Sequence, residues 1–140
     1  MTIDANTPLG ARAIQRLNDE RVSWLVTVTP AGQPQPSPIW HELDLETGTI
    51  LMYSKPDTSK LRSIAANPRV ALHLDGNGRG GDILVVEGRA VVSDEAGADQ
   101  RPTYVERYRD FMSRNGWSAE DFARMYSVPV RITPTKLRGW

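Results

Sequence analysis

Short stretches in which apolar side chains occupy every second position recur along most of this chain, and they constrain its fold more than any other feature. A period of two indicates a strand with one buried face. The pattern predicts strands at residues 22–29, 49–54, 70–74, 84–92 and 128–133. Many short strands with few helices favour a small β-barrel over a parallel sheet.

A sixth predicted strand, at about residues 34–43, carries prolines at alternate positions: Pro34, Pro36 and Pro38. Proline has no backbone N–H, so all three remove donors from one edge, which cannot be fully paired. The N–H groups of Ser37 and Ile39 could then meet polar ring atoms of a flat ligand, with Trp40 as an aromatic wall. The alternative is an edge strand that proline protects against aggregation.

Capping residues and apolar spacing predict four short helices, the first of which opens the domain. Thr7 followed by proline is typical of a helix start. Asp57 or Thr58 can cap a second helix that runs to about residue 66, and a third begins near residue 100. Ser118 with an aspartate three residues later resembles a capping box and starts the fourth.

Length and charge limit the function classes. The 140 residues suit a single domain, residues 1–140, with its own core. With 17 basic and 17 acidic residues, the chain lacks the positive field of a nucleic-acid binder, so no nucleic acid is expected as a partner. Cysteine is absent, and no apolar stretch approaches the roughly 20 residues that span a bilayer. We expect a cytoplasmic protein with no membrane partner.

The segment from Tyr53 to Arg62 passes from a strand end into a helix start, and it is the strongest candidate for a binding site. It carries three cations and three aliphatic hydroxyls: Ser54, Lys55, Thr58, Ser59, Lys60 and Arg62. Free N–H groups and the positive end of the helix dipole already gather there, so added cations cost a few tenths of a kcal/mol unless an anion is bound. The segment therefore predicts a phosphate site.

Lys60 is the better candidate for the phosphate than Arg62. The two residues are two positions apart, so their side chains diverge around the helix. The alternative for the whole segment is a solvated helix start whose hydroxyls serve only as caps.

The two histidines and a glycine-rich run carry weaker signals. His41 and His73 belong to no metal-ligand pattern, and each is better interpreted as a surface or packed residue. Residues 76–81 have alternating glycines but join two predicted strands, so they are not a dinucleotide fingerprint.

Several motifs together resemble the FMN-binding split β-barrel family, which includes pyridoxamine 5′-phosphate oxidase. They are the proline-rich second strand, Tyr53-Ser54, Thr58-Ser59-Lys60 and Asn67-Pro68-Arg69-Val70. The short length, the segment Pro36-Ser37-Pro38-Ile39-Trp40 and the ending Lys136-Leu137-Arg138-Gly139-Trp140 are most similar to its actinobacterial deazaflavin-dependent branch, whose members use coenzyme F420.

This resemblance implies a mainly β (α+β) fold: a six-stranded split β-barrel with flanking short helices, forming a homodimer with the cofactor between subunits. It implies a phosphate held by Ser54, Thr58, Ser59 and Lys60. The cofactor ring would lie along the strand Ser37, Pro38, Ile39 and Trp40. Tyr53 adjoins the phosphate segment, and Lys55, Lys60 and Arg62 would meet the phosphate or the acidic tail of the coenzyme.

The expected activity is that of an oxidoreductase in which reduced coenzyme F420 passes a hydride to an unsaturated small molecule. The proton could come from water or from a side chain such as His41. One alternative keeps the fold but binds FMN, and another is a non-catalytic carrier of a flavin or deazaflavin. Vitamin B6 oxidation is not expected, because prolines stand where the oxidases carry a phosphate-binding arginine.

Overall fold

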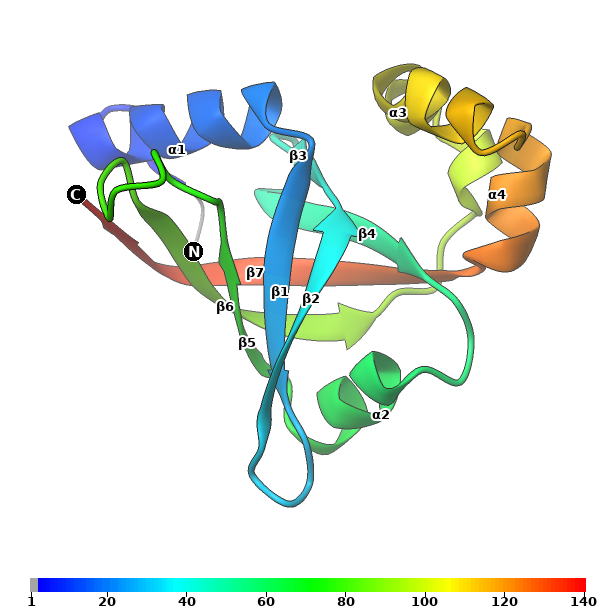
Figure 1. Ribbon diagram of the computed structural model, residues 1–140, viewed down its shortest axis with the longest axis horizontal. Helices are drawn as coiled ribbons and strands as arrows, with labels where there is room; N and C mark the ends of the chain where they lie inside the picture. The colour runs from blue at the N-terminus through cyan, green and yellow to red at the C-terminus, as the bar shows by residue number, and fades with distance from the viewer. Residues whose placement is uncertain (1–2) are drawn as a thin grey trace.

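A curled antiparallel sheet with four α-helices around it makes up the protein in the computed structural model, which describes residues 3–140 (Figure 1). The strands are β1 Val22–Val28, β2 Pro34–Trp40, β3 Glu42–Asp44, β4 Thr49–Ser54, β5 Arg69–His73, β6 Leu84–Val92 and β7 Val128–Gly139. The helices are α1 Pro8–Asp19, α2 Ser59–Ala66, α3 Pro102–Arg114 and α4 Ala119–Met125, and the short 3₁₀ turn η1 Ala98–Gln100 precedes α3.

The strand order β2-β1-β5-β6-β7-β4-β3 shows how the sheet closes. β2 and β3 lie at opposite ends of this order, yet a single residue, His41, joins them in the chain. The two ends of the sheet must therefore meet at His41, and the sheet curls into a barrel. In the described chain β2 pairs only with β1, so the barrel is split along the open edge of β2.

The sheet has seven strands where the sequence predicted six, because the predicted strand 34–43 is broken at His41. The imidazole is completely buried, with Nδ1 2.7 Å from Ser23 Oγ and Nε2 2.9 Å from Leu17 O. A carbonyl oxygen only accepts, so Nε2 carries the proton and Nδ1 accepts from the serine hydroxyl. Held from two sides, His41 turns the chain from β2 into β3.

The buried face of β1 belongs to Ser23, Leu25 and Thr27. The more apolar set on the other face, which includes Val26 and Val28, is only half-buried. Alternation alone could not assign the faces, because Ser23 is needed inside to bond His41. On β6 every second residue from Leu84 to Ala90 is buried, and Val92 is exposed.

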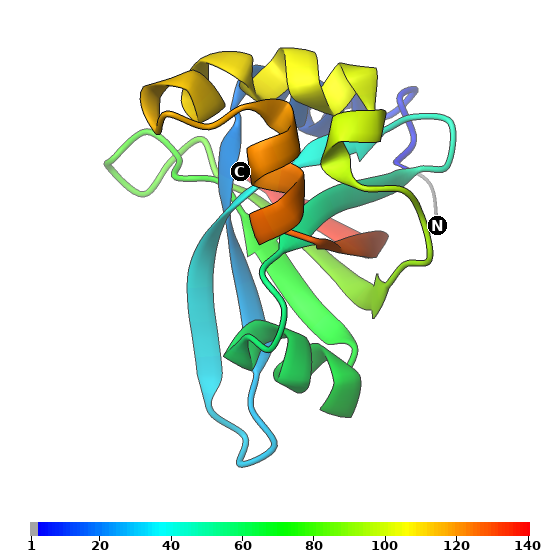
Figure 2. The same cartoon turned by 90° about the vertical axis from the view of Figure 1, so that its right-hand side faces the viewer.

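Two apolar clusters form the core. One fills the barrel and includes Leu25, Ile50, Leu72 and Val86. The other lies between the outer side of β4 and the pair α3 and α4, and it is rich in aromatic rings. Figure 2 shows this helical pair covering one end of the sheet, well away from α2.

The predicted helix caps are confirmed. Thr7 Oγ1 accepts from Gly10 N at 3.0 Å, and Thr58 Oγ1 accepts from Leu61 N at 3.2 Å. Ser118 and Asp121 form the capping box at the start of α4. None of the helices within residues 3–140 combines the length and the apolar character that a membrane crossing requires.

An ion cluster fastens the segment before α3 to the sheet. Arg131 of β7 binds Glu95 with two nitrogens, at 2.7 and 2.9 Å, and Asp44 at 2.8 Å. Arg101 also pairs with Asp44 and with Glu42. Burial alone would raise the pKa of Asp44, but the hydrogen bond from Arg131 and the charge of Arg101 hold it below its usual value.

Candidate functional site

The start of α2 and the edge strand β2 enclose a polar pocket of about 500 Å³. We call it the polar pocket; its lining is Thr27, Gln33, Pro34, Gln35, Pro36, Ser37, Thr58, Ser59 and Lys60. This lining contains one charged side chain, Lys60, and no carboxylate. An uncompensated cation among hydroxyl and amide groups suits an anion such as a phosphate.

Lys60 is half-buried, and none of the ion pairs recorded within residues 3–140 involves it. Burial lowers the pKa of its ammonium group, since the charged form loses hydration that no carboxylate replaces. A bound anion would supply the missing partner.

Local hydrogen bonds position the hydroxyls of this segment. Ser59 Oγ donates to Gln35 Oε1 at 3.0 Å and so ties α2 to β2. Ser54 is buried; its hydroxyl donates to Lys55 O and lies 3.2 Å from Thr58 Oγ1. The N–H groups of Ser59 and Lys60 stand in the first turn of α2, where no intrahelical acceptor exists.

Three residues that were predicted to meet the phosphate, Ser54, Lys55 and Arg62, are not part of the lining of the polar pocket. Arg62 donates to Asp57 O at 2.7 Å, so its guanidinium closes the loop before α2. Asp57 has a positive φ of 61°, and this contact holds the loop in that conformation. The ammonium of Lys55 lies 5.5 Å from the centre of the Tyr126 ring, a cation–π contact with α4.

The open edge of β2 differs from the expectation drawn from its prolines. β2 pairs with β1 along its whole length, and Ser37 stands opposite Leu25. Because proline cannot donate, the N–H groups that bond β1 are those of Gln35, Ser37 and Ile39. These groups are therefore not free for a ligand, and the open edge carries carbonyl oxygens instead.

A second pocket of about 240 Å³ lies between β2 and the helices α3 and α4. We call it the aromatic pocket; its lining is Pro38, Ile39, Trp40, Tyr53, Lys60, Tyr104, Asn115, Trp117, Phe122 and Tyr126. Lys60 belongs to both linings, so the two pockets meet at its side chain. Together they line β2 with one polar end that carries a cation and one end suited to a flat ring.

Trp40 was expected to offer its ring to a ligand, but most of the indole packs against other aromatic rings. Its indole stacks on Tyr108, with ring centres 5.0 Å apart, and on Phe122 at 5.2 Å. Phe122 in turn stacks on Tyr126 at 4.7 Å, and the three interplanar angles are 8°, 7° and 11°. Four nearly parallel rings, from α3, β2, α4 and the residue that follows α4, thus form an aromatic stack that fixes the wall of the pocket.

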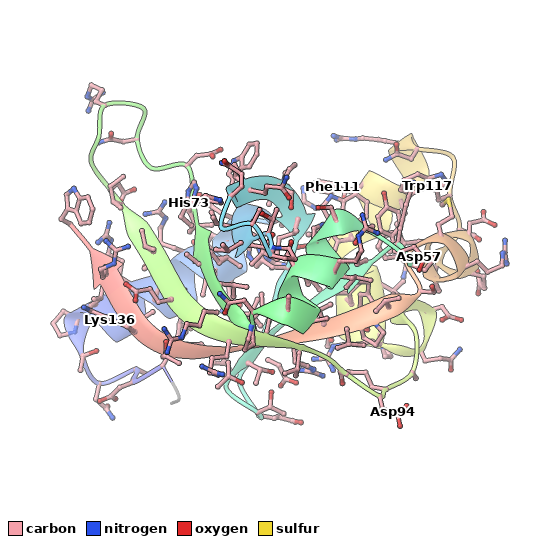
Figure 3. The ribbon with its side chains drawn as sticks, turned by 90° about the horizontal axis from the view of Figure 1, so that it is seen from below. Asp57, His73, Asp94, Phe111, Trp117 and Lys136 are labelled. Atoms are coloured by element: carbon pink, nitrogen blue, oxygen red, sulfur yellow. The ribbon has the colours of Figure 1, made fainter. Side chains whose placement is uncertain are left out.

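Neither histidine takes part in the two pockets. Burial is the main reason that the pKa of His41 falls to about 4, and both of its ring nitrogens are bonded within the protein. The expectation that His41 could supply a proton is therefore wrong. Figure 3 shows His73 towards the opposite end of the molecule from Asp57 and Trp117, which lie at the same end.

The sequence interpretation missed the helical half of the aromatic pocket. Tyr104 falls in the third predicted helix, and Trp117 and Phe122 flank the predicted start of the fourth, where no binding role was expected. The available signal was the density of aromatic residues between positions 104 and 126. It cannot distinguish a packed core from a pocket wall, because both roles favour the same residue types.

Comparisons with known proteins agree with this architecture. The sequence profile of the family described as pyridoxamine 5′-phosphate oxidase matches residues 11–140. No curated protein sequence matches the chain.

Solved structures share the fold. A conserved hypothetical protein from Mycobacterium tuberculosis has a TM-score of 0.71 at 25% identity, covering 93% of this chain and 82% of its own. An F420 reductase has a TM-score of 0.63 at 22% identity, with 89% and 94% covered. An FAD-binding protein from Mesorhizobium loti has a TM-score of 0.60 at 22% identity, with 91% and 88% covered.

The profile match spans nearly the whole chain, and the split barrel has the fold of these structures. The chain therefore belongs to the pyridoxamine 5′-phosphate oxidase family.

Proposed function

We propose that this protein is an oxidoreductase that binds coenzyme F420 along β2 and transfers a hydride from the reduced coenzyme to an unsaturated small molecule. The observation that carries the proposal is the junction of the polar and aromatic pockets at Lys60. A ligand that suits both must be anionic at one end and flat at the other, as phosphorylated flavins and deazaflavins are. The F420 reductase of the same fold supports the choice of coenzyme.

In this proposal the polar pocket holds the phosphate. Lys60 supplies the charge, and Thr58 and Ser59 supply hydroxyls on the first turn of α2. Lys55 stands beside α4, at the border of the aromatic pocket, where a longer acidic tail could reach it. Ser54 supports this segment through the contact of its hydroxyl with Thr58 Oγ1.

The aromatic pocket would place the ring and the hydride acceptor against each other and exclude water. When bound, the coenzyme supplies the hydride chemistry. The chain supplies orientation through β2, and its only charged group in this lining is Lys60. We assign no catalytic acid, because His41 is buried in a neutral form and the tyrosines at the pocket, Tyr53 and Tyr104, have their pKa values raised by burial.

The test is a fluorescence titration of the cofactor-free protein with coenzyme F420 and, separately, with FMN. Tight binding of F420 with weak binding of FMN supports the proposal and justifies a turnover screen over enones, quinones and nitro compounds. The reverse preference makes the protein an FMN-binding oxidoreductase. Tight binding without turnover across the screen identifies a carrier, and binding of neither ligand refutes the proposal.

We also propose that the protein acts as a homodimer. A groove of about 650 Å³ runs over the outer face of the sheet, with Val26, Val28 and Ala71 among its apolar lining. Arginine and glutamate side chains, including Arg69 and Glu87, rim this groove. Such a half-buried apolar strip with charges of both signs suits a second copy of the same face.

A further inference from the structure

The open edge of β2 offers hydrogen-bond acceptors and lacks donors over five consecutive residues, Pro34–Pro38. In a strand, the N–H and C=O of one residue point to the same edge, and those of its neighbours point to the other. Gln35 and Ser37 direct both groups at β1, so the open edge receives only proline carbonyls. The first N–H donor beyond them on that edge belongs to Trp40.

The carbonyls of this edge differ in what they already bond. Pro34 O accepts from the Gln33 side chain at 3.1 Å, and Trp40 O lies 3.4 Å from the Tyr104 hydroxyl. Of the side-chain hydrogen bonds recorded within residues 3–140, none ends on Pro36 O or Pro38 O. These two acceptors border the polar and the aromatic pocket respectively.

Flavins and 5-deazaflavins share most of their polar ring edge but differ at position 5. A flavin has a nitrogen there, which accepts a hydrogen bond in the oxidised ring, whereas a 5-deazaflavin has a C–H group. Both rings carry an imide N–H that can donate to a carbonyl. Moving a hydrogen-bond acceptor from water to a place where no donor faces it lowers the binding affinity. A C–H group at the same place carries no such penalty.

We propose that the proline-spaced edge of β2, through Pro36 and Pro38, selects a 5-deazaflavin over a flavin. The proposal rests on the proposed function, because it requires the ring to lie along this edge. The carbonyls of Pro36 and Pro38 accept from the ring, and this edge offers no N–H group to nitrogen 5 of a flavin. The ammonium of Lys60 borders both pockets, and in this proposal it binds the anion.

The sharpest test compares FMN with 5-deaza-FMN, which differ at position 5 and carry the same phosphate chain. Contributions from the polar pocket then cancel in the ratio of dissociation constants. For the unaltered protein we expect 5-deaza-FMN to bind more tightly by a factor of roughly two to ten, the effect of one net hydrogen bond. Calorimetry or fluorescence measures both constants without any turnover.

Replacing Pro36 or Pro38 with alanine returns one N–H donor to the open edge. Pro36→Ala or Pro38→Ala should improve FMN binding relative to 5-deaza-FMN and bring the ratio towards one. Pro34→Ala is the matched control. It adds the same donor at the start of the strand, farther along β2 from the aromatic pocket than Pro36 or Pro38, and should change both affinities alike.

Three results would overturn the inference. Equal affinities of the unaltered protein for the two ligands remove the selectivity, whether or not the variants fold. A ratio that stays unchanged in Pro36→Ala and Pro38→Ala assigns the selectivity to other residues. If FMN, 5-deaza-FMN and F420 all fail to bind, the proposed function itself is refuted. If both FMN ligands bind tightly with a ratio near one, only the selectivity is refuted.

Discussion

Lys60 connects the two pockets and is the one cation of the polar pocket. Replacing it with alanine should weaken binding of a phosphorylated cofactor by roughly 1.5–3 kcal/mol, the range for a hydrogen bond to a charged group. Titration of the purified variant with the cofactor measures the change. Arg62→Ala is the control, since that guanidinium already bonds Asp57 O, and its effect should be smaller. Unchanged affinity in Lys60→Ala would remove Lys60 from the site.

His41 should make stability depend on pH over a defined interval. Its pKa is about 4 in the folded protein against 6.5 in the unfolded chain, so between these values the unfolded chain binds more protons. The contribution is fully present above pH 6.5 and is lost as the pH falls towards 4. A difference of this size corresponds to a loss on the order of 3 kcal/mol.

Urea unfolding at a series of pH values between 7 and 4 tests this prediction. The variant His41→Gln should be less stable at neutral pH but should lose less stability on acidification. His73→Gln is the control, because it removes the other histidine and leaves the contacts of His41 with Ser23 and Leu17 intact. A parallel decline in the His41→Gln variant and the unaltered protein would contradict the assignment.

The aromatic stack joins three elements, since Tyr108 belongs to α3, Trp40 to β2 and Phe122 to α4. Arg107 of α3 also donates to Leu17 O and His41 O, and the ion cluster around Arg131 holds the segment before α3. The stack therefore forms a wall of the aromatic pocket and also attaches α3 and α4 to β2. Trp40 is a packing residue as well as a pocket residue.

Trp40→Ala should lower the free energy of unfolding by about 3 kcal/mol, because it removes a ring packed between two others. Chemical denaturation followed by circular dichroism measures the loss. Trp24→Ala on the outer face of β1 removes the same side chain from a half-buried position and should cost less. Equal losses in the two variants would show that the stack contributes no special stability.

The outer groove over β1, β5 and β6 gives a prediction for the whole molecule. If this face binds a second copy, sedimentation equilibrium should yield twice the mass of the chain. Val26→Asp should shift the protein to the monomer, since a buried carboxylate without a partner opposes association. Val91→Asp, at a residue that is 56% exposed, is the control and should leave the dimer intact. A monomer in the unaltered protein would refute the homodimer.

Residue patterns in the chain were sufficient to predict the helix caps, most strands and the gathering of Thr58, Ser59 and Lys60 at the start of α2. These features depend on neighbours within a few positions, where capping and alternation act directly. This end of the polar pocket was predictable for the same reason, since a helix start brings its own N–H groups and hydroxyls together.

Three features required the folded chain. The break at His41 depends on Ser23 and Leu17, which lie 18 and 24 positions away. The direction of the N–H groups of β2 follows from its pairing with β1 on one side only. The aromatic pocket arises where α3 and α4 fold back over β2 and β4. Each depends on contacts between distant parts of the chain. A local sequence pattern does not specify which distant surface a segment will contact.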